Sequence, residues 1–280
     1  MEFSLLQWVL ITIIFSWSGF VRSGFGFGGA LFTLPFLLLV HDDPLFFLPI
    51  IGLHLLFFAP LTIFQNSKQS VNGTFGASDI KINWEFLRFA FLVMIVPKVV
   101  GVIGLISLPQ QLVNTIIFIL IGVYSVTYII KKPFKSNSNF TDFILLALGG
   151  YVSGNSLIGG PMIVAVAMKR IPPPEFRQTL FVLWIFLVMI KMIAFWVANV
   201  PIYYLIALFL LPFAWLGNNI GNKLHQQILT KDTSKIQQLI GILLLFSSIL
   251  GVSNALHLID GNRQSQITVK STHSALPLRF

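Results

Sequence analysis

The chain alternates between long apolar runs and short polar connectors, a pattern that predicts several membrane-spanning helices. Two further apolar regions, at about residues 4–40 and 142–169, are interrupted by glycines. Glycine is unfavourable in the interior of a helix, so these two regions predict broken helices. Six uninterrupted runs reach the roughly 20 residues that a helix needs to cross a bilayer. They lie at about 44–64, 86–108, 111–130, 176–199, 202–222 and 236–257.

The two interrupted regions occupy corresponding places in two halves of the chain. Each is followed by a connector and three spanning runs, and aligning Gly28-Gly29 with Gly159-Gly160 brings them into register. A weaker match between "PKVVG" and "GNNIG" sets Lys98 opposite Asn218. Matched glycine-interrupted segments in two halves are typical of a transporter's binding site.

The positions of the basic residues predict how the chain crosses the membrane. If each interrupted region enters and leaves on one face, as a re-entrant hairpin, the basic loops all lie on the same side. If each region is a single crossing, the same cations divide evenly, against the positive-inside rule. The first region has an alternative with two complete crossings, which leaves the parity unchanged. The cations concerned are Lys68, Lys81, Arg88, Lys131, Lys132, Lys135, Lys169, Arg170, Arg177, Lys223, Lys231 and Lys235.

The fold expected from these patterns is an all-α integral membrane protein with two inverted repeats. Each repeat consists of a glycine-interrupted re-entrant helical hairpin followed by three transmembrane helices. One transmembrane domain is expected over residues 1–258, with repeat 1 at about 4–131 and repeat 2 at about 142–257. Residues 259–280 are polar and aperiodic, which predicts a flexible tail. The N-terminus is expected outside.

Composition supports a membrane protein and excludes several other classes. The chain is 56% hydrophobic and 10% charged, with a mean hydropathy of +0.86, more than a soluble domain of this length could bury. It has no cysteine, so disulfides, thiolate metal sites and cysteine nucleophiles are excluded. The net charge of +9 is explained by cytoplasmic loops rather than by nucleic-acid binding. Motifs of enzymes are absent, and no cofactor is expected.

Three cations, Arg22, Lys98 and Lys191, lie within apolar segments without a nearby carboxylate in the sequence. An ionisable residue inside a membrane is a functional hypothesis by default, and an anionic substrate would supply the missing charge. Exposed N–H groups of glycine-rich backbone and helix N-termini would also attract an anion.

Each cation also has a structural alternative. Arg22 can mark the cytoplasmic end of a plain crossing, Lys98 can satisfy a carbonyl freed by Pro97, and Lys191 can snorkel or stay neutral. Polar and glycine residues near the two hairpin tips, and Asn218, complete the candidate site. The predicted substrate-binding set is Arg22, Ser23, Gly26, Gly28, Gly29, Lys98, Asn155, Ser156, Gly159, Gly160, Lys191 and Asn218.

Three segments resemble the sulfite exporter TauE/SafE family. "SGFGFGGALFTLP" (23–35) looks like its first-repeat signature, with Ala30 in place of a third glycine. "SGNSLIGGPMI" (153–163) is similar to the second signature, and "EFRQTLF" (175–181) resembles an arginine-threonine pattern that follows it. The resemblance implies a permease of a bacterial inner membrane that moves sulfite, sulfoacetate or related organosulfonates. At Asn155-Ser156 the chain departs from the family pattern.

The expected function is a secondary transporter or facilitator that moves a small, sulfur-containing anion by alternating access. An anion channel and a non-transporting sensor or assembly subunit are the alternatives. The expected partners are a small anionic substrate and the lipid bilayer, without nucleic acid, and a homodimer is left open.

Overall fold

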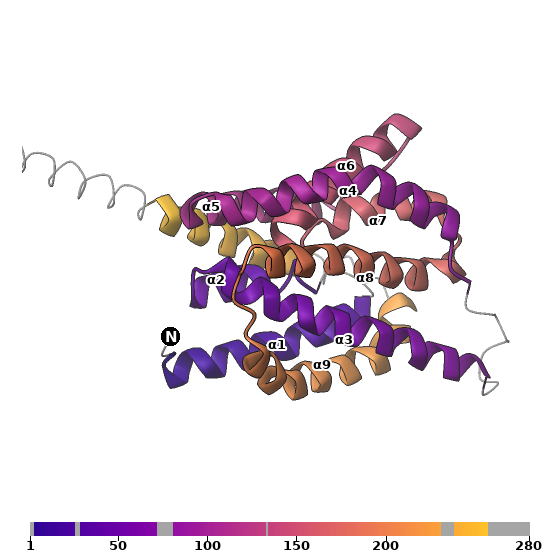
Figure 1. Ribbon diagram of the computed structural model, residues 1–280. Coiled ribbons are helices and arrows are strands. Elements are labelled where there is room, and N and C mark those ends of the chain that lie inside the picture. The colour runs from indigo at the N-terminus through magenta and orange to yellow at the C-terminus, as the bar shows by residue number, and fades with distance from the viewer. Residues whose placement is uncertain (1–2, 26–28, 72–80, 133, 231–237, 257–280) are drawn as a thin grey trace, which may run out of the picture.

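The computed structural model describes residues 3–25, 29–71, 81–132, 134–230 and 238–256, and within these ranges the chain forms helices and no strand (Figure 1). A C-terminal helix, Gln238–Leu256, follows the labelled helices. The labelled helices are α1 (Leu5–Phe25), α2 (Leu34–Val40), α3 (Pro44–Val71), α4 (Trp84–Ser107), α5 (Gln110–Ile129), α6 (Asn139–Ser156), α7 (Gly160–Arg170), α8 (Pro173–Val197) and α9 (Tyr204–Thr230).

Seven of the described helices are long and apolar enough to cross a membrane. Six of them coincide with the uninterrupted apolar runs, which confirms the all-α membrane fold and these spans. The seventh is Leu5–Gly24 in α1, the first arm of the first interrupted region. The two interrupted regions each form a pair of helices, as their glycines predicted: α1 with α2, and α6 with α7.

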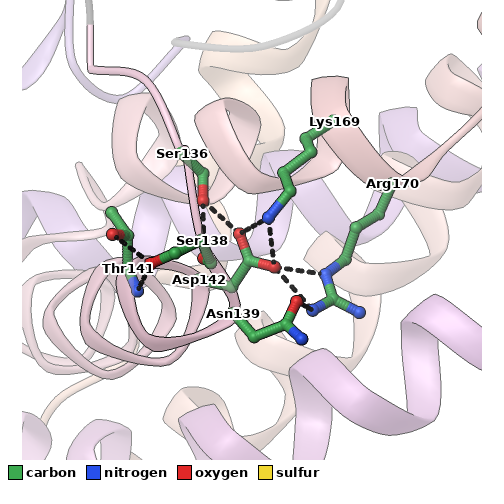
Figure 2. A network of polar contacts seen from close by, with 7 residues as sticks. All are labelled: Ser136, Ser138, Asn139, Thr141, Asp142, Lys169 and Arg170. Carbon is green, nitrogen blue, oxygen red and sulfur yellow. Dashed lines mark hydrogen bonds and ion pairs between the residues drawn. The ribbon is translucent and has the colours of Figure 1, made fainter.

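In the second hairpin, ion pairs join the first turn of α6 to the last turn of α7. Asp142 in the first turn of α6 is fully buried and pairs with Lys169 and Arg170 in the last turn of α7 (Figure 2). The Arg170 Nε lies 2.6 Å from the Asp142 carboxylate, and the Lys169 Nζ lies 3.2 Å from it. Ser136 also donates to this carboxylate. The hairpin as a whole therefore begins and ends at the same face of the protein.

The electrostatics of Asp142 favour its ionised form. Burial raises the pKa of its carboxyl, but hydrogen bonds from Ser136, Arg170 and Lys169 outweigh burial and hold the pKa below its ordinary value. A buried charge is tolerable when it is paired and hydrogen-bonded in this way.

In the first hairpin, uncharged contacts join the start of α1 to the end of α2. The Gln7 side-chain amide donates to the carbonyl oxygen of Val40 at 3.1 Å, and the Phe3 ring meets the His41 ring edge to face. With seven residues, α2 rises only about 10 Å. That is too short for a bilayer, so the alternative of two complete crossings in this region is wrong.

The two hairpins open toward opposite ends of the molecule. In Figure 1 the open end of α1 and α2 lies at the left, beside the marked N-terminus, and that of α6 and α7 lies at the right. Each first arm packs along the second spanning helix of the other half: α1 against α9, and α6 against α4. The first spanning helices, α3 and α8, pack against each other.

Glycines set the close approach at both of these arm-to-helix contacts. A Cβ on Gly19 of α1 would overlap the carbonyl oxygen of Ala214, and a Cβ on Gly150 of α6 would overlap that of Met94. Gly19 and Gly150 differ by the offset that aligns Gly28 with Gly159, and Met94 and Ala214 differ by the offset that aligns Lys98 with Asn218. The contacts thus pair the same positions as the sequence repeat. How the halves are oriented relative to a membrane stays a prediction.

Candidate functional site

A cavity of about 40 Å³ lies where the inner ends of the two hairpins meet α3 and α8. One water needs roughly 10–15 Å³ by this measure, so the space suits about three waters or one small ion. Its walls combine one cation, two glycines and one serine with apolar and aromatic side chains. The lining residues are Arg22, Gly29, Ala30, Leu31, Leu55, Ser153, Leu157, Ile158, Gly160, Phe181, Trp184, Leu187 and Val188.

Arg22 contributes the charge that lines this cavity. The side chain is 4% exposed, and its Cζ lies 4.3 Å from the centroid of the Phe58 ring. Its Nε and Nη2 have no hydrogen-bond partner within the described residues. A buried guanidinium with unused donors is costly unless a ligand or water satisfies them, so the arrangement favours an anion. Arg22 lies in the last turn of α1 and is buried there rather than exposed.

Lys98 and Lys191 converge on the C-terminal end of α6 instead of lining the cavity. The Nζ of Lys98 donates to the Ser153 hydroxyl at 2.9 Å and to the Ser153 carbonyl at 3.3 Å, and that of Lys191 donates to the Asn155 carbonyl at 3.1 Å. Both lysines are essentially fully buried. Their ammonium groups interact favourably with the negative end of the helix dipole and donate to carbonyls that the end of a helix leaves without a partner. Lys98 thus contacts the lining residue Ser153, whereas Lys191 contacts Asn155, which does not line the cavity.

The remaining polar candidates do not line the cavity. The Ser23 hydroxyl lies within hydrogen-bond distance of the Gly19 and Asn218 carbonyl oxygens, and its single proton can donate to either, which brings α1 close to α9. Ser156 donates to the Val152 carbonyl one turn back. Asn155 and Asn218 are fully buried, and neither polar atom of either amide has a partner among the described residues.

The family of the chain follows from a comparison with family models. The model described as "Sulfite exporter TauE/SafE" matches residues 10–250. The chain belongs to this family. It is therefore a membrane transporter of the TauE/SafE type, as the resemblance of its glycine-rich segments implied. No curated protein and no solved structure matches the chain.

The signature glycines of this TauE/SafE protein fall into three groups. Gly29 and Gly160 line the cavity. Gly159 serves packing, because a Cβ there would overlap the carbonyl oxygen of Gly149 in the other arm of the hairpin. Gly26 and Gly28 lie outside the described residues.

Ser153 is the cavity residue that sequence reasoning missed in this TauE/SafE protein. The signal was available, because the alignment of Gly28-Gly29 with Gly159-Gly160 also sets Arg22 opposite Ser153. In the structure both line the cavity. The aromatic residues Phe181 and Trp184 of α8 were also missed, because an apolar helix carries no signal for which face meets a cavity.

Proposed function

We propose that this protein moves a small oxyanion, with sulfite as the first substrate to test, across the cytoplasmic membrane. The observation that carries the proposal is the buried guanidinium of Arg22, which has unused donors and lines a cavity between the two hairpins. An anion at this position would neutralise the charge and accept hydrogen bonds from the free N–H groups. The sulfur chemistry comes from the family description alone.

Cavity size supports a compact anion over a larger sulfonate. About 40 Å³ accommodates an ion of a few heavy atoms. Sulfoacetate and related organosulfonates carry additional carbon and oxygen atoms, and they would need the surrounding walls to move apart. Sulfite therefore ranks above the organosulfonates as a substrate of the cavity in this form.

Alternating access is the transport mechanism that we propose. The cavity is lined by both hairpins together with α3 and α8, so a displacement of one half against the other would open it to one side at a time. Lys98 and Lys191 do not line the cavity, but their positive potential would attract the anion without direct contact.

The test is sulfite flux into proteoliposomes for the wild type, Arg22→Gln and Arg88→Gln. Arg88 is an exposed arginine, so its variant controls for the loss of one positive charge. We expect saturable sulfite flux and counterflow in the wild type and in Arg88→Gln, and loss of most flux in Arg22→Gln. No sulfite flux from correctly folded wild-type protein, or full flux in Arg22→Gln, would contradict the proposal.

A further inference from the structure

We propose that Ser153 is a second substrate-binding residue, whose hydroxyl donates to the anion held by Arg22, and that Lys98 positions this hydroxyl. The inference rests on the proposed function and assigns the residue that completes the site from the second hairpin.

Ser153 lines the cavity, and its hydroxyl has a free donor. Its Oγ accepts a hydrogen bond from the Lys98 Nζ at 2.9 Å, the side chain is buried, and the residue lines the cavity. A lysine ammonium can only donate, so the hydroxyl proton of Ser153 is left for another acceptor. Hydrogen bonding to a cation also makes that proton a stronger donor.

Two other buried serines near the breaks of the hairpins have a carbonyl oxygen of their own helix within hydrogen-bond distance. Ser23 donates to the Gly19 carbonyl at 2.8 Å, and Ser156 donates to the Val152 carbonyl at 3.0 Å, both one turn back. Such bonds are the usual resting arrangement of a serine in a helix. Ser153 makes no such bond within the described part of the chain, where its hydroxyl accepts from Lys98.

The internal repeat gives an independent reason to look at this position. Ser153 corresponds to Arg22, and its partner Lys98 corresponds to Asn218. Arg22 with Asn218, and Lys98 with Ser153, therefore each combine one cation from the first half with one neutral polar residue from the second. The cation lies on the hairpin arm in one combination and on the spanning helix in the other. Lys98 thus affects the cavity through its hydrogen bond to Ser153, whereas Arg22 lines the cavity itself. An oxyanion has several acceptor oxygens and can therefore accept hydrogen bonds from both residues at once.

Lys98 acts as a positioning residue in this arrangement, because its ammonium contacts Ser153 and Lys98 does not itself line the cavity. Substituting Ser153 leaves Lys98 in place, with the Ser153 carbonyl still within 3.3 Å of its Nζ. A test based on Ser153 therefore avoids the destabilisation that removal of a buried cation would cause.

The experiment measures KM and maximal rate for sulfite in proteoliposomes that contain wild type, Ser153→Ala, Ser153→Thr or Ser125→Ala. Ser125 is a matched control, since it is a fully buried serine of α5 that donates to its own helix. We expect Ser153→Ala to raise KM about tenfold or more, as for a lost hydrogen bond to a charged ligand. Ser153→Thr should recover most of the affinity, and Ser125→Ala should match the wild type.

A double-variant cycle separates the positioning role from direct contact. If Lys98 acts through Ser153, Lys98→Met combined with Ser153→Ala raises KM less than the product of the single effects. A KM within twofold of wild type in Ser153→Ala, while Arg22→Gln abolishes flux, overturns this inference and leaves the proposed function standing. Absence of flux in the wild type overturns the proposed function instead.

Discussion

Arg22 of α1 and Ser153 of α6 line the same cavity from positions that the internal repeat pairs with each other. Each lies on the first arm of its hairpin, close to the break between the two arms. The two hairpins therefore present different chemistry at one place: a guanidinium from the first, and a lysine-bound hydroxyl from the second. This difference makes the cavity asymmetric although the helices around it pair symmetrically.

The glycines between α4 and α6 give a prediction about stability. A Cβ on Gly101 would overlap the Tyr151 carbonyl oxygen, so Gly101→Ala should cost about 1–3 kcal/mol and lower the Tm in detergent by several degrees. Gly104 is the control in the same helix, because a Cβ there meets only the Leu108 Cδ1, at 3.8 Å. Gly104→Ala should leave the Tm unchanged or slightly higher. Equal Tm values for the two variants would mean that α4 and α6 do not pack this closely.

Much of this fold is predictable from the sequence, because lipid imposes long apolar helices that a hydropathy pattern shows directly. Each uninterrupted run became a helix, and the glycines marked both breaks. The turn at Leu157, where φ is 61°, was not predictable, because it uses an apolar residue where glycine or asparagine is usual.

The candidate site was predictable only in part. Arg22, Gly29 and Gly160 were named from charge and glycine patterns, and they line the cavity. Ser153 was missed although the repeat pairs it with Arg22, because a serine carries no charge and its Lys98 partner is distant in the sequence. The lysines illustrate the same limit, because a sequence shows a charge inside a span but not whether its ammonium meets a cavity or a helix end.

The clamp at the second hairpin gives a prediction with pH dependence. Asp142 has a folded pKa below its ordinary value of 3.8, so its ion pairs contribute stability above that value and lose it as the pH falls through the folded pKa. Asp142→Asn should cost about 1–2 kcal/mol at pH 7, because both cations are about one-third exposed and water screens them.

Thermal unfolding from pH 7 down to pH 3 checks this expectation. The Tm difference between wild type and Asp142→Asn should be constant at neutral pH and shrink below about pH 4. Asp42 is exposed, and Asp42→Asn should follow the wild type throughout. A pH-independent difference for Asp142→Asn would show that the loss comes from packing rather than from charge.

The path of the chain gives a prediction about topology. Reporter domains fused at Asn66 and Arg170 should both report the cytoplasm, because the second hairpin returns to the face at which it began. A fusion at Asp42, between α2 and α3, should report the opposite side, together with an external N-terminus. Opposite results at Asn66 and Arg170 would exclude the inverted-hairpin topology, and the measurement is independent of any transport assay.

The contact of Lys191 with the end of α6 predicts a structural effect. Its ammonium lies 3.1 Å from the Asn155 carbonyl and 5.5 Å from the Phe195 ring, so Lys191→Met should lower the Tm by several degrees. The KM for sulfite should change less than after substitution of Arg22, because Lys191 does not line the cavity. A KM rise as large as that of an Arg22 variant, without a change in Tm, would instead indicate direct anion contact.

The correspondence between the two halves predicts that the positive charge can be moved from position 22 to position 218. Arg22→Ser alone should lose most sulfite flux, because it removes the cation from the cavity wall. Adding Asn218→Lys recreates, where α1 packs against α9, the serine and lysine found at Ser153 and Lys98, and flux should recover in part. Asn218 lies next to this arm, since Ser23 donates to its carbonyl at 2.9 Å.

The control for the exchange is Asn218→Lys with Arg22 retained. It adds a second buried cation next to the arm that carries Arg22, so it should fold less stably and transport more slowly than the double variant. The diagnostic result is therefore a double variant that is more active than either single variant. If the double variant is as inactive as Arg22→Ser, a guanidinium is required at this position, and the two pairs are equivalent in packing but not in anion recognition.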